Sequence, residues 1–168
     1  LYFTVVSQST DNEGTTTLTM LLSTNIDDCY MDFVYTLAAD DYMVDMSIQP
    51  HNMQWALAQN MSSLEMQWNQ LIPQQEKGRK FEEKYAQLQY MFVGGDIEKL
   101  SEMKADRAKE SARLKWIAYK DQFFSTVLIA GDAFESTQME STPMNALSRH
   151  IKEYKTTASL PFEKKKKK

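Results

Sequence analysis

The sequence predicts a mostly β protein whose antiparallel strands stack into a sandwich. Apolar and polar residues alternate with a period of two over several segments, which is the pattern of strands with one buried face. Turn-forming groups of Asp, Asn and Gly separate these segments at intervals of about ten residues, as in an antiparallel meander. One stretch, Asp96–Arg113, departs from this pattern because it is rich in good helix formers.

The first third of the chain predicts consecutive β-hairpins. Strands are expected at residues 1–7, 15–23, 29–37 and 42–49. In the third of these, Met31, Phe33, Tyr35 and Leu37 fall on one face, and the intervening residues fall on the other. Pro50 is expected to end the fourth strand, because proline cannot donate to the strand ladder.

The rest of the chain mixes strands with short helical segments. Further strands are expected at residues 64–69, 85–93, 114–119, 123–130, 133–140 and 151–160. Residues 51–60 and 74–84 are expected to form a loop or short helical turns, and Gly131-Asp132 a turn between two strands. Asp96–Arg113 is the best helix candidate, solvated or loosely docked because it has few apolar residues.

The charge of the chain is divided between an acidic body and a basic tail. The net charge is −4, but Lys164–Lys168 form an unbroken run of five lysines, and without them 14 basic residues face 23 acidic ones. The acidic body makes nucleic acid an unsuitable partner. A terminal homopolymer cannot pack, so the tail is expected to be a solvated linker or an artificial addition, with a membrane-surface or nucleic-acid patch as the alternative.

Cys29, the hydropathy pattern and the first residues indicate which covalent links, membrane spans and flanking segments to expect. Cys29 is the only cysteine, so no disulfide can form within the chain, and a buried, inert thiol is expected. The best apolar run, Phe123–Ala130, is interrupted by Ser125 and Thr126 and is far shorter than the roughly 20 residues of a membrane-spanning helix. Because a strand is already under way at Leu1, we expect the chain to be a piece of a longer protein.

Neither a catalytic group nor a metal or cofactor site is predicted. His51 and His150 have no further nitrogen or sulfur ligands, so both are expected in loops. Asp27-Asp28 and Asp40-Asp41 contain the carboxylates of an acid–base pair, but they fall in predicted turns, where Asp caps backbone groups. The sequence also lacks nucleotide-binding, serine-hydrolase and zinc-peptidase motifs. We therefore predict that the chain is not an enzyme.

Methionine and aromatic residues are expected mainly in the core or on sheet faces. Methionines at alternating strand positions are Met20, Met31, Met46 and Met66. The expected inter-sheet core contains Trp68, Tyr90, Phe92, Trp116, Phe123 and Phe124. A cleft lined by Trp55 and Trp68, which would bind a peptide or a sugar, is a competing hypothesis.

The segment Lys115–Ala130 resembles a signature of the large periplasmic domain of the YidC-type membrane protein insertases. In that family a Trp-containing strand leads through a Gln-aromatic-aromatic step into an apolar strand, and here Trp116, Phe123, Phe124 and Leu128 occupy those positions. Three further stretches agree in order and spacing, residues 35–45 (a "YTL…YxVD" hairpin), 71–90 and 153–162.

The resemblance implies a β-supersandwich of the galactose-mutarotase type, with one or two short helices, over residues 1–163. Trp116, Phe123, Phe124 and Leu128 would belong to its structural core. The parent protein would lie in the bacterial inner membrane, with a membrane helix before this piece, an insertase core of five helices after it, and this domain on the periplasmic face. No catalytic residue, cofactor or metal ion is implied.

The resemblance also implies a function. The domain would be an accessory part of an insertase that helps insert, fold and assemble inner-membrane proteins, alone or with the Sec translocon. Its partners would be Sec translocon components and nascent membrane proteins, and it would act by protein contact or as a scaffold. The alternatives are a carbohydrate-binding or mutarotase-like domain, which sugar titration would reveal, and a secreted structural protein.

Overall fold

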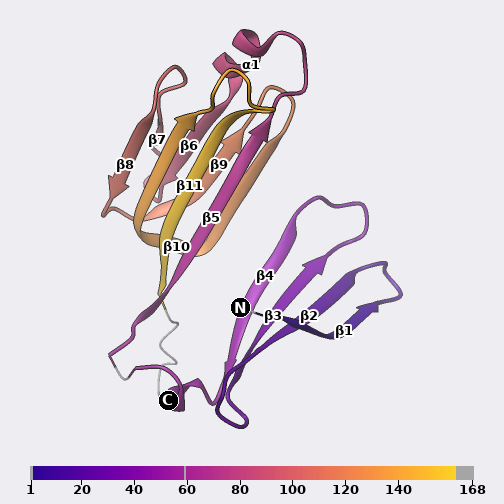
Figure 1. Ribbon diagram of the computed structural model, residues 1–168. Coiled ribbons are helices and arrows are strands. Elements are labelled where there is room, and N and C mark those ends of the chain that lie inside the picture. Colours follow the sequence, from indigo (N-terminus) through magenta and orange to yellow (C-terminus); the bar gives the residue numbers. More distant parts are fainter. Residues whose placement is uncertain (1, 59, 162–168) are drawn as a thin grey trace. The chain divides into compact units, whose positions relative to one another are not determined.

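A computed structural model describes residues 2–58 and 60–161 of the chain. The chain divides into two compact units, unit 1 (Leu1–Met61) and unit 2 (Ser62–Lys168), and each is described by itself. Both units are built from antiparallel strands, and the described residues contain one α-helix (Figure 1). The predicted mostly β, antiparallel fold is therefore confirmed. The lysine run lies outside the described residues.

Unit 1 is a meander in which each strand pairs with the next strand in the chain (Figure 1). Its elements are β1 (Thr4–Thr10), β2 (Thr16–Ser23), β3 (Tyr30–Leu37), β4 (Val44–His51) and the short 3-10 helix η1 (Met53–Trp55). Gly14 has a φ of +84° in the β1–β2 turn, and a Cβ there would lie 2.9 Å from that of Ala39. The predicted turns before and after β3 contain Asp28 and Asp40, each with a positive φ.

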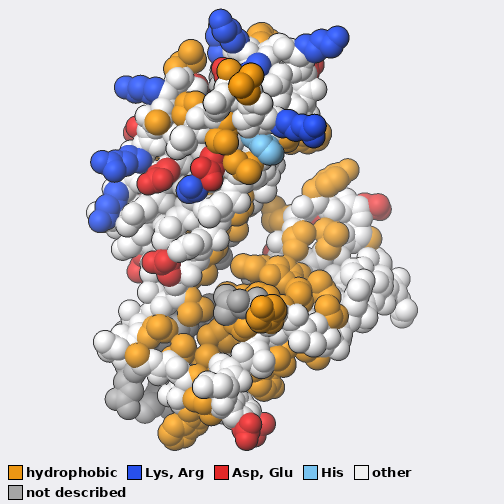
Figure 2. Space-filling model, viewed as in Figure 1, with side chains coloured by type: hydrophobic (Ala, Val, Ile, Leu, Met, Phe, Trp, Pro, Cys, Tyr) orange, Lys and Arg blue, Asp and Glu red, His pale blue; other side chains and the backbone are white. Residues whose placement is uncertain are grey.

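The two faces of the unit 1 sheet differ in polarity. The pairs Leu18–Tyr35, Met20–Phe33 and Leu22–Met31 place apolar side chains of β2 and β3 on one face. The register of β4 continues that face with Met46, Ile48 and Pro50. Met31 is buried, but most of this face is only half-buried or exposed, and Figure 2 shows hydrophobic side chains gathered over the unit.

Pro50 lies within β4, so the prediction that it ends the strand is wrong. The strand is at the edge of the sheet, with β3 on one side only. On an edge strand, proline is tolerated where its backbone nitrogen faces away from the neighbouring strand, because no N–H is needed there. Pairing with β3 therefore continues to His51.

Unit 2 is a sandwich in which one long strand belongs to both layers. Its elements are β5 (Ser63–Pro73), α1 (Arg79–Tyr85), β6 (Gln87–Phe92), β7 (Ile97–Lys99), β8 (Asp106–Glu110), β9 (Leu114–Lys120), β10 (Ser125–Pro143) and β11 (His150–Pro161). The first half of β10 pairs with β9, and its second half pairs with β11 and β8. Register shifts on both sides of Glu135, and a φ of 48° at Ser136, accompany this change of partner.

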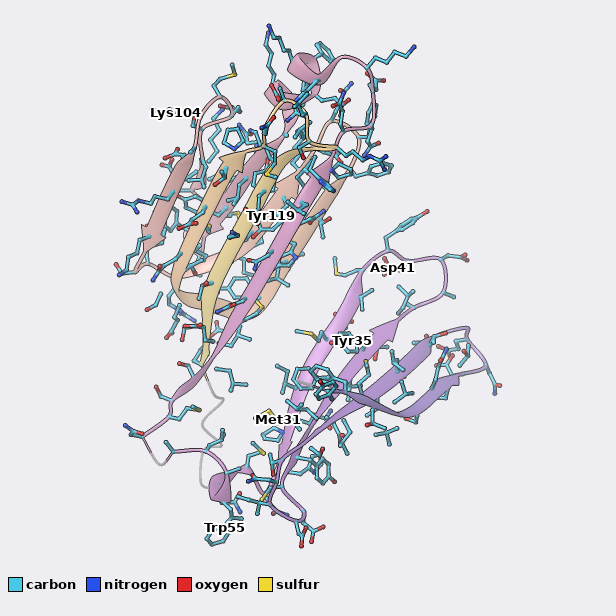
Figure 3. The ribbon with its side chains drawn as sticks, viewed as in Figure 1. Met31, Tyr35, Asp41, Trp55, Lys104 and Tyr119 are labelled. Atoms are coloured by element: carbon cyan, nitrogen blue, oxygen red, sulfur yellow. The ribbon has the colours of Figure 1, made fainter. Side chains whose placement is uncertain are left out.

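Contacts between strands that are not sheet neighbours show that the two layers face each other. The rings of Tyr119 on β9 and Trp68 on β5 stack with centroids 3.9 Å apart. The Tyr119 hydroxyl donates to the Trp68 carbonyl oxygen at 2.8 Å and lies 2.6 Å from Thr156 Oγ1 (Figure 3 labels Tyr119). Fully buried residues of this core include Leu88, Leu114, Ile117, Tyr119, Met139, Ile151, Tyr154 and Ala158.

Two predictions for unit 2 are wrong, because both segments belong to strands. Asp96–Arg113 is not a helix, because it contains β7 and β8. Inward and outward positions alternate along β8, so ladder bonds with β10 override the helix propensity of Ala, Lys and Glu. Gly131-Asp132 does not turn the chain, because it lies inside the continuous strand β10. The helical turns expected within 74–84 are confirmed as α1.

Candidate functional site

The residues considered for chemistry occupy structural positions. His51 stacks on Tyr30, and its Nε2 lies 3.0 Å from a carboxylate oxygen of Asp32. His51 ends β4 and His150 begins β11, so the expectation that both lie in loops is wrong. The His150 carbonyl oxygen accepts a hydrogen bond from Arg79. Within residues 2–58 and 60–161, no group of three His, Cys, Asp or Glu side chains is placed to hold a metal ion.

The aspartates of the predicted turns cap backbone groups. Asp41 Oδ1 accepts hydrogen bonds from the backbone N–H groups of Tyr42 and Met43 at 2.7 and 3.0 Å. Asp28 and Asp40 have left-handed backbone conformations of the kind that Asp tolerates in turns. The expected buried thiol is also confirmed, because Cys29 is buried and its Sγ contacts the carbonyl oxygen of Asn52 at 3.2 Å.

The two tryptophans of the proposed cleft have different environments. Trp55 is exposed in unit 1, whereas Trp68 belongs to unit 2 and stacks on Tyr119. The face of the Trp68 ring that stacks on Tyr119 is therefore unavailable to a sugar. Hollows in unit 2 lie beside β8 and β10, where Arg107 and Glu140 line them.

The four signature residues have different environments. Leu128 packs partly buried against the core of unit 2, and Trp116 is half-buried on β9. Phe123 and Phe124 are exposed, so their placement in the inter-sheet core is wrong. The reason is the hairpin between β9 and β10: Asp121 Oδ1 accepts the backbone N–H groups of both phenylalanines, at 2.7 and 2.5 Å, and this turn holds them outside the two layers.

One end of unit 2 is fixed by a network around α1. Arg79 donates to the carbonyl oxygens of Met144, Ser148 and His150 at 2.8–3.1 Å and pairs with Glu83 at 2.7 Å. These bonds fasten the helix to the loop between β10 and β11, since the three carbonyl groups lie in or beside that loop.

Buried Glu82 holds the loop that precedes α1. Its two carboxylate oxygens accept the backbone N–H groups of Gln75 and Glu76 at 2.9 and 2.5 Å. Gln75 Nε2 in turn donates to Asp121 in the β9–β10 hairpin at 3.2 Å. Helix, loop and hairpin therefore form one connected end of the sandwich (Figure 1).

Lys152 is a buried cation beneath this end, and the sequence analysis did not single it out. Its ammonium group donates to the carbonyl oxygen of Ala86, the residue that follows α1, at 2.5 Å. Burial lowers the pKa of Lys152 to about 8, although the carboxylates of Glu102 and Glu83 act in the opposite direction. Ile151 and Lys152 are both buried, next to a shift in the strand register. An alternating pattern predicts only one buried residue of each consecutive pair, so it did not indicate that Lys152 is buried.

Apolar side chains remain exposed on the same end of unit 2. Phe81 and Tyr85 lie one helical turn apart on α1 with ring centroids 4.9 Å apart, and both are exposed. Leu147, in the β10–β11 loop, is 94% exposed and Phe124 is 68% exposed. Exposed aromatic and aliphatic side chains that gather on one surface indicate a site of interaction.

Of the helices in the described part of the chain, none combines the length and hydropathy of a bilayer-spanning segment. The strands and the packed interior of unit 2 define the class of the molecule as a β-rich domain. Its buried polar groups, such as Glu82, Lys152 and Tyr119, form structural hydrogen bonds.

Comparison with known proteins identifies the family. The family model described as the YidC periplasmic domain matches residues 1–167, and this chain belongs to that family. The membrane protein insertase YidC of Azobacteroides pseudotrichonymphae is 48% identical over 161 residues, which is 96% of this chain and 25% of the relative. The YidC protein of Parabacteroides distasonis is 45% identical over 97% of this chain and 25% of the relative. The YidC protein of Phocaeicola vulgatus is 37% identical over 90% of this chain and 24% of the relative. No solved structure matches the chain.

The comparisons confirm the resemblance seen in the sequence and place the chain on the periplasmic side of the inner membrane. The chain spans about a quarter of the length of these curated relatives. The family is therefore established for a segment that corresponds to about a quarter of these relatives.

Proposed function

We propose that this chain is an extracytoplasmic accessory domain of an insertase, which helps to insert, fold and assemble inner-membrane proteins, alone or together with the Sec translocon. The domain comprises residues 1–163, with residues 164–168 as a linker or addition. It acts by contact with proteins or as a scaffold. Its partners are nascent membrane proteins and Sec translocon components.

The match of the family model over residues 1–167 is the observation that carries this proposal. The relatives that cover most of the chain are named membrane protein insertases. Insertion itself requires polar groups shielded from lipid among transmembrane helices. A strand sandwich with a packed interior, such as unit 2, contributes through its surface, and a contact or scaffold role follows from that.

A chimeric insertase tests the proposal. The matching segment of the Parabacteroides distasonis protein is replaced by this chain, and a photoreactive amino acid is placed at an exposed aromatic position, Tyr42, Trp55 or Phe124. Illumination during synthesis of a membrane protein is expected to yield crosslinks to the nascent chain or to Sec subunits. The same residue at buried Tyr154 is the matched control, from which no crosslink is expected.

The contact role would be refuted by a chimera that inserts membrane proteins normally but forms no crosslink to either partner from any exposed position. Crosslinks to nascent chains without any to Sec subunits would support contact and refute the Sec partnership. The readout depends only on proximity, so it does not require the domain to be essential for insertion.

A further inference from the structure

The end of unit 2 that carries α1 combines exposed cations with exposed apolar side chains. We refer to it as the basic–aromatic end, and it comprises residues 74–86, 100–105, 120–124 and 144–150. The hydrogen bonds of Arg79, Glu82 and Gln75 connect the first, third and fourth of these segments. The second segment is joined to the first by Gln87, the residue that follows the first segment, which donates a hydrogen bond to Glu102. Lys104 appears at this end of the unit in Figure 3.

The charge of this end is opposite to that of the rest of the chain. Its exposed cations are Lys77, Lys80, Lys84, Lys104, Lys120 and Arg149. Its acids are Glu76, which is exposed, Glu82, which is buried, and the half-buried Glu83, Glu102 and Asp121. Glu83 pairs with Arg79, Glu102 pairs with Lys99, and Asp121 accepts backbone hydrogen bonds. Outside this end, residues 1–163 contain seven basic and 18 acidic residues. Figure 2 shows Lys and Arg side chains next to hydrophobic ones over the α1 end.

Six exposed apolar side chains project from this end, and four of them come from segments held by hydrogen bonds. The six are Phe81, Tyr85, Met103, Phe123, Phe124 and Leu147. Asp121 fixes the hairpin of Phe123 and Phe124 through two backbone hydrogen bonds, and three bonds of Arg79 hold the helix of Phe81 and Tyr85 to the neighbouring loop. The four aromatic side chains are therefore presented without ordering of a loop on binding.

We propose that the basic–aromatic end binds the surface of an anionic phospholipid bilayer. Lysine and arginine are attracted to anionic headgroups, and aromatic side chains with apolar rings enter the boundary between headgroups and acyl chains. A polar protein surface would complement the cations but would leave six large apolar side chains in water. A bilayer interface accommodates both the cations and the apolar side chains.

This inference goes beyond the proposed accessory function, since it names a lipid surface as a partner that protein contact does not require. A domain on the periplasmic side of the membrane that binds the bilayer at one end would keep the rest of its surface close to emerging segments. The two proposals fail independently, because lipid binding is measured without any insertase or nascent chain.

Flotation with lipid vesicles tests the proposal on the full chain. Vesicles contain phosphatidylethanolamine with either anionic phosphatidylglycerol or neutral phosphatidylcholine. Lys164–Lys168 are replaced by Gln in every protein used, since five lysines bind anionic lipid by themselves. We expect the chain to float with the anionic vesicles and to be released as salt concentration rises, because salt screens exposed charges.

Charge-reversal variants identify the surface that binds. Lys77→Glu, Lys80→Glu and Lys84→Glu together are expected to weaken binding by at least about tenfold, because each cation near an anionic surface contributes roughly a factor of five. The matched control is Arg107→Glu, Lys109→Glu and Lys155→Glu, which changes net charge equally at exposed positions on β8 and β11. The control is expected to retain binding within about twofold.

Replacement of two exposed phenylalanines tests the contribution of apolar side chains to binding. Phe123→Ser with Phe124→Ser is expected to weaken binding by about tenfold or more through loss of apolar insertion. The control is Val93→Ser with Ile97→Ser, exposed apolar residues in the β6–β7 hairpin. Circular dichroism confirms that each variant is folded.

Three outcomes would overturn the proposal. They are no flotation with anionic vesicles, equal losses in the surface and control variants, and equal binding to neutral vesicles. If the chain fails to float but an acidic protein binds in a manner sensitive to the three lysine substitutions, the end is a protein-binding surface instead.

Discussion

Unit 2 closes its apolar surface upon itself, whereas unit 1 is a single sheet with an apolar face that no second layer of its own described residues covers. In unit 2, Leu114, Ile117 and Tyr154 are 0% exposed. In unit 1 the most buried side chain is Cys29 at 3%, and strand β1 is exposed along its whole length. Both units show the same alternation of apolar and polar residues in the sequence.

This difference teaches that alternation specifies a face but not the layer that covers it. Unit 2 gains its second layer from β10, which changes partner along its length and brings β5 and β11 over β9. The meander of unit 1 contains no strand of that kind, because each of its strands pairs only with its sequence neighbours. We therefore expect the stability of the two units to differ.

A matched pair of leucine truncations should show the largest difference. Leu114→Ala removes a side chain that is 0% exposed, and we expect the free energy of unfolding to fall by about 2–5 kcal/mol. Leu37→Ala, at a position that is 38% exposed in unit 1, should cost less than about 1 kcal/mol. Urea denaturation measures both, and equal losses would contradict the comparison.

The buried cation of unit 2 should make its stability depend on pH. The pKa of Lys152 is lowered to about 8 in the folded state, below the unfolded value of 10.5, so between these values the unfolded state binds more protons. Its contribution to stability therefore rises with pH above about 8, by about 2 kcal/mol at most by pH 9.5.

The substitution Lys152→Met should abolish this rise, whereas Lys155→Met at an exposed position of the same strand should keep it. Urea denaturation at a series of pH values up to about 9.5 measures the slope in a range where most tyrosine side chains remain protonated. Burial raises the pKa of Tyr119 and Tyr154, which lowers stability only as pH rises above their unfolded value. A slope unchanged in the methionine variant would refute the assignment to Lys152.

Hydrogen exchange should separate the units without any mutation. We expect backbone amides of β9 and β11 to exchange at least about tenfold more slowly than those of β1 and β4, because strands in a closed core open only with much of the fold. Exchange monitored by mass spectrometry gives protection for each peptide. Similar protection in both units would show that another surface covers the unit 1 sheet in solution.

The smallest effect is expected within the signature segment itself. Phe124→Ala should change the free energy of unfolding by no more than about 0.5 kcal/mol, since Phe124 is 68% exposed. Leu128→Ala should cost about 1–2 kcal/mol, because Leu128 packs partly buried against the core. Thermal unfolding compares the two variants. A larger loss of stability for Phe124→Ala than for Leu128→Ala would show that Phe124 is buried in the core.

The local pattern predicted most strands and several turns. The face shared by Met31, Phe33 and Tyr35 is confirmed by their cross-strand partners, and the turns at Asp28 and Asp40 have the expected conformation. These features depend on neighbouring residues, because side-chain alternation and turn chemistry act over a few positions. The family resemblance, based on Trp116–Ala130 and three other stretches, is confirmed for the same reason: it is carried by the order of residues.

The errors concern features that depend on distant partners. Asp96–Arg113 has a helical composition, but its strand β8 pairs with β10 about thirty residues later along the chain. The exposure of Phe124 depends on how Asp121 caps the hairpin. The burial of Lys152 depends on the carbonyl group of Ala86 and on the packing of α1. Local propensity contains no information about any of these contacts.

The sequence alone therefore determined the class of fold, the strands of unit 1 and the family, because periodicity and residue order are local properties. Tertiary structure alone decided which apolar residues became core, through the shared strand β10 and the layer it closes. It also decided that cations and aromatic side chains from four separate segments meet at one end of unit 2. Burial and surface chemistry are created by contacts between segments that are distant in the chain, and only the folded molecule brings those segments together.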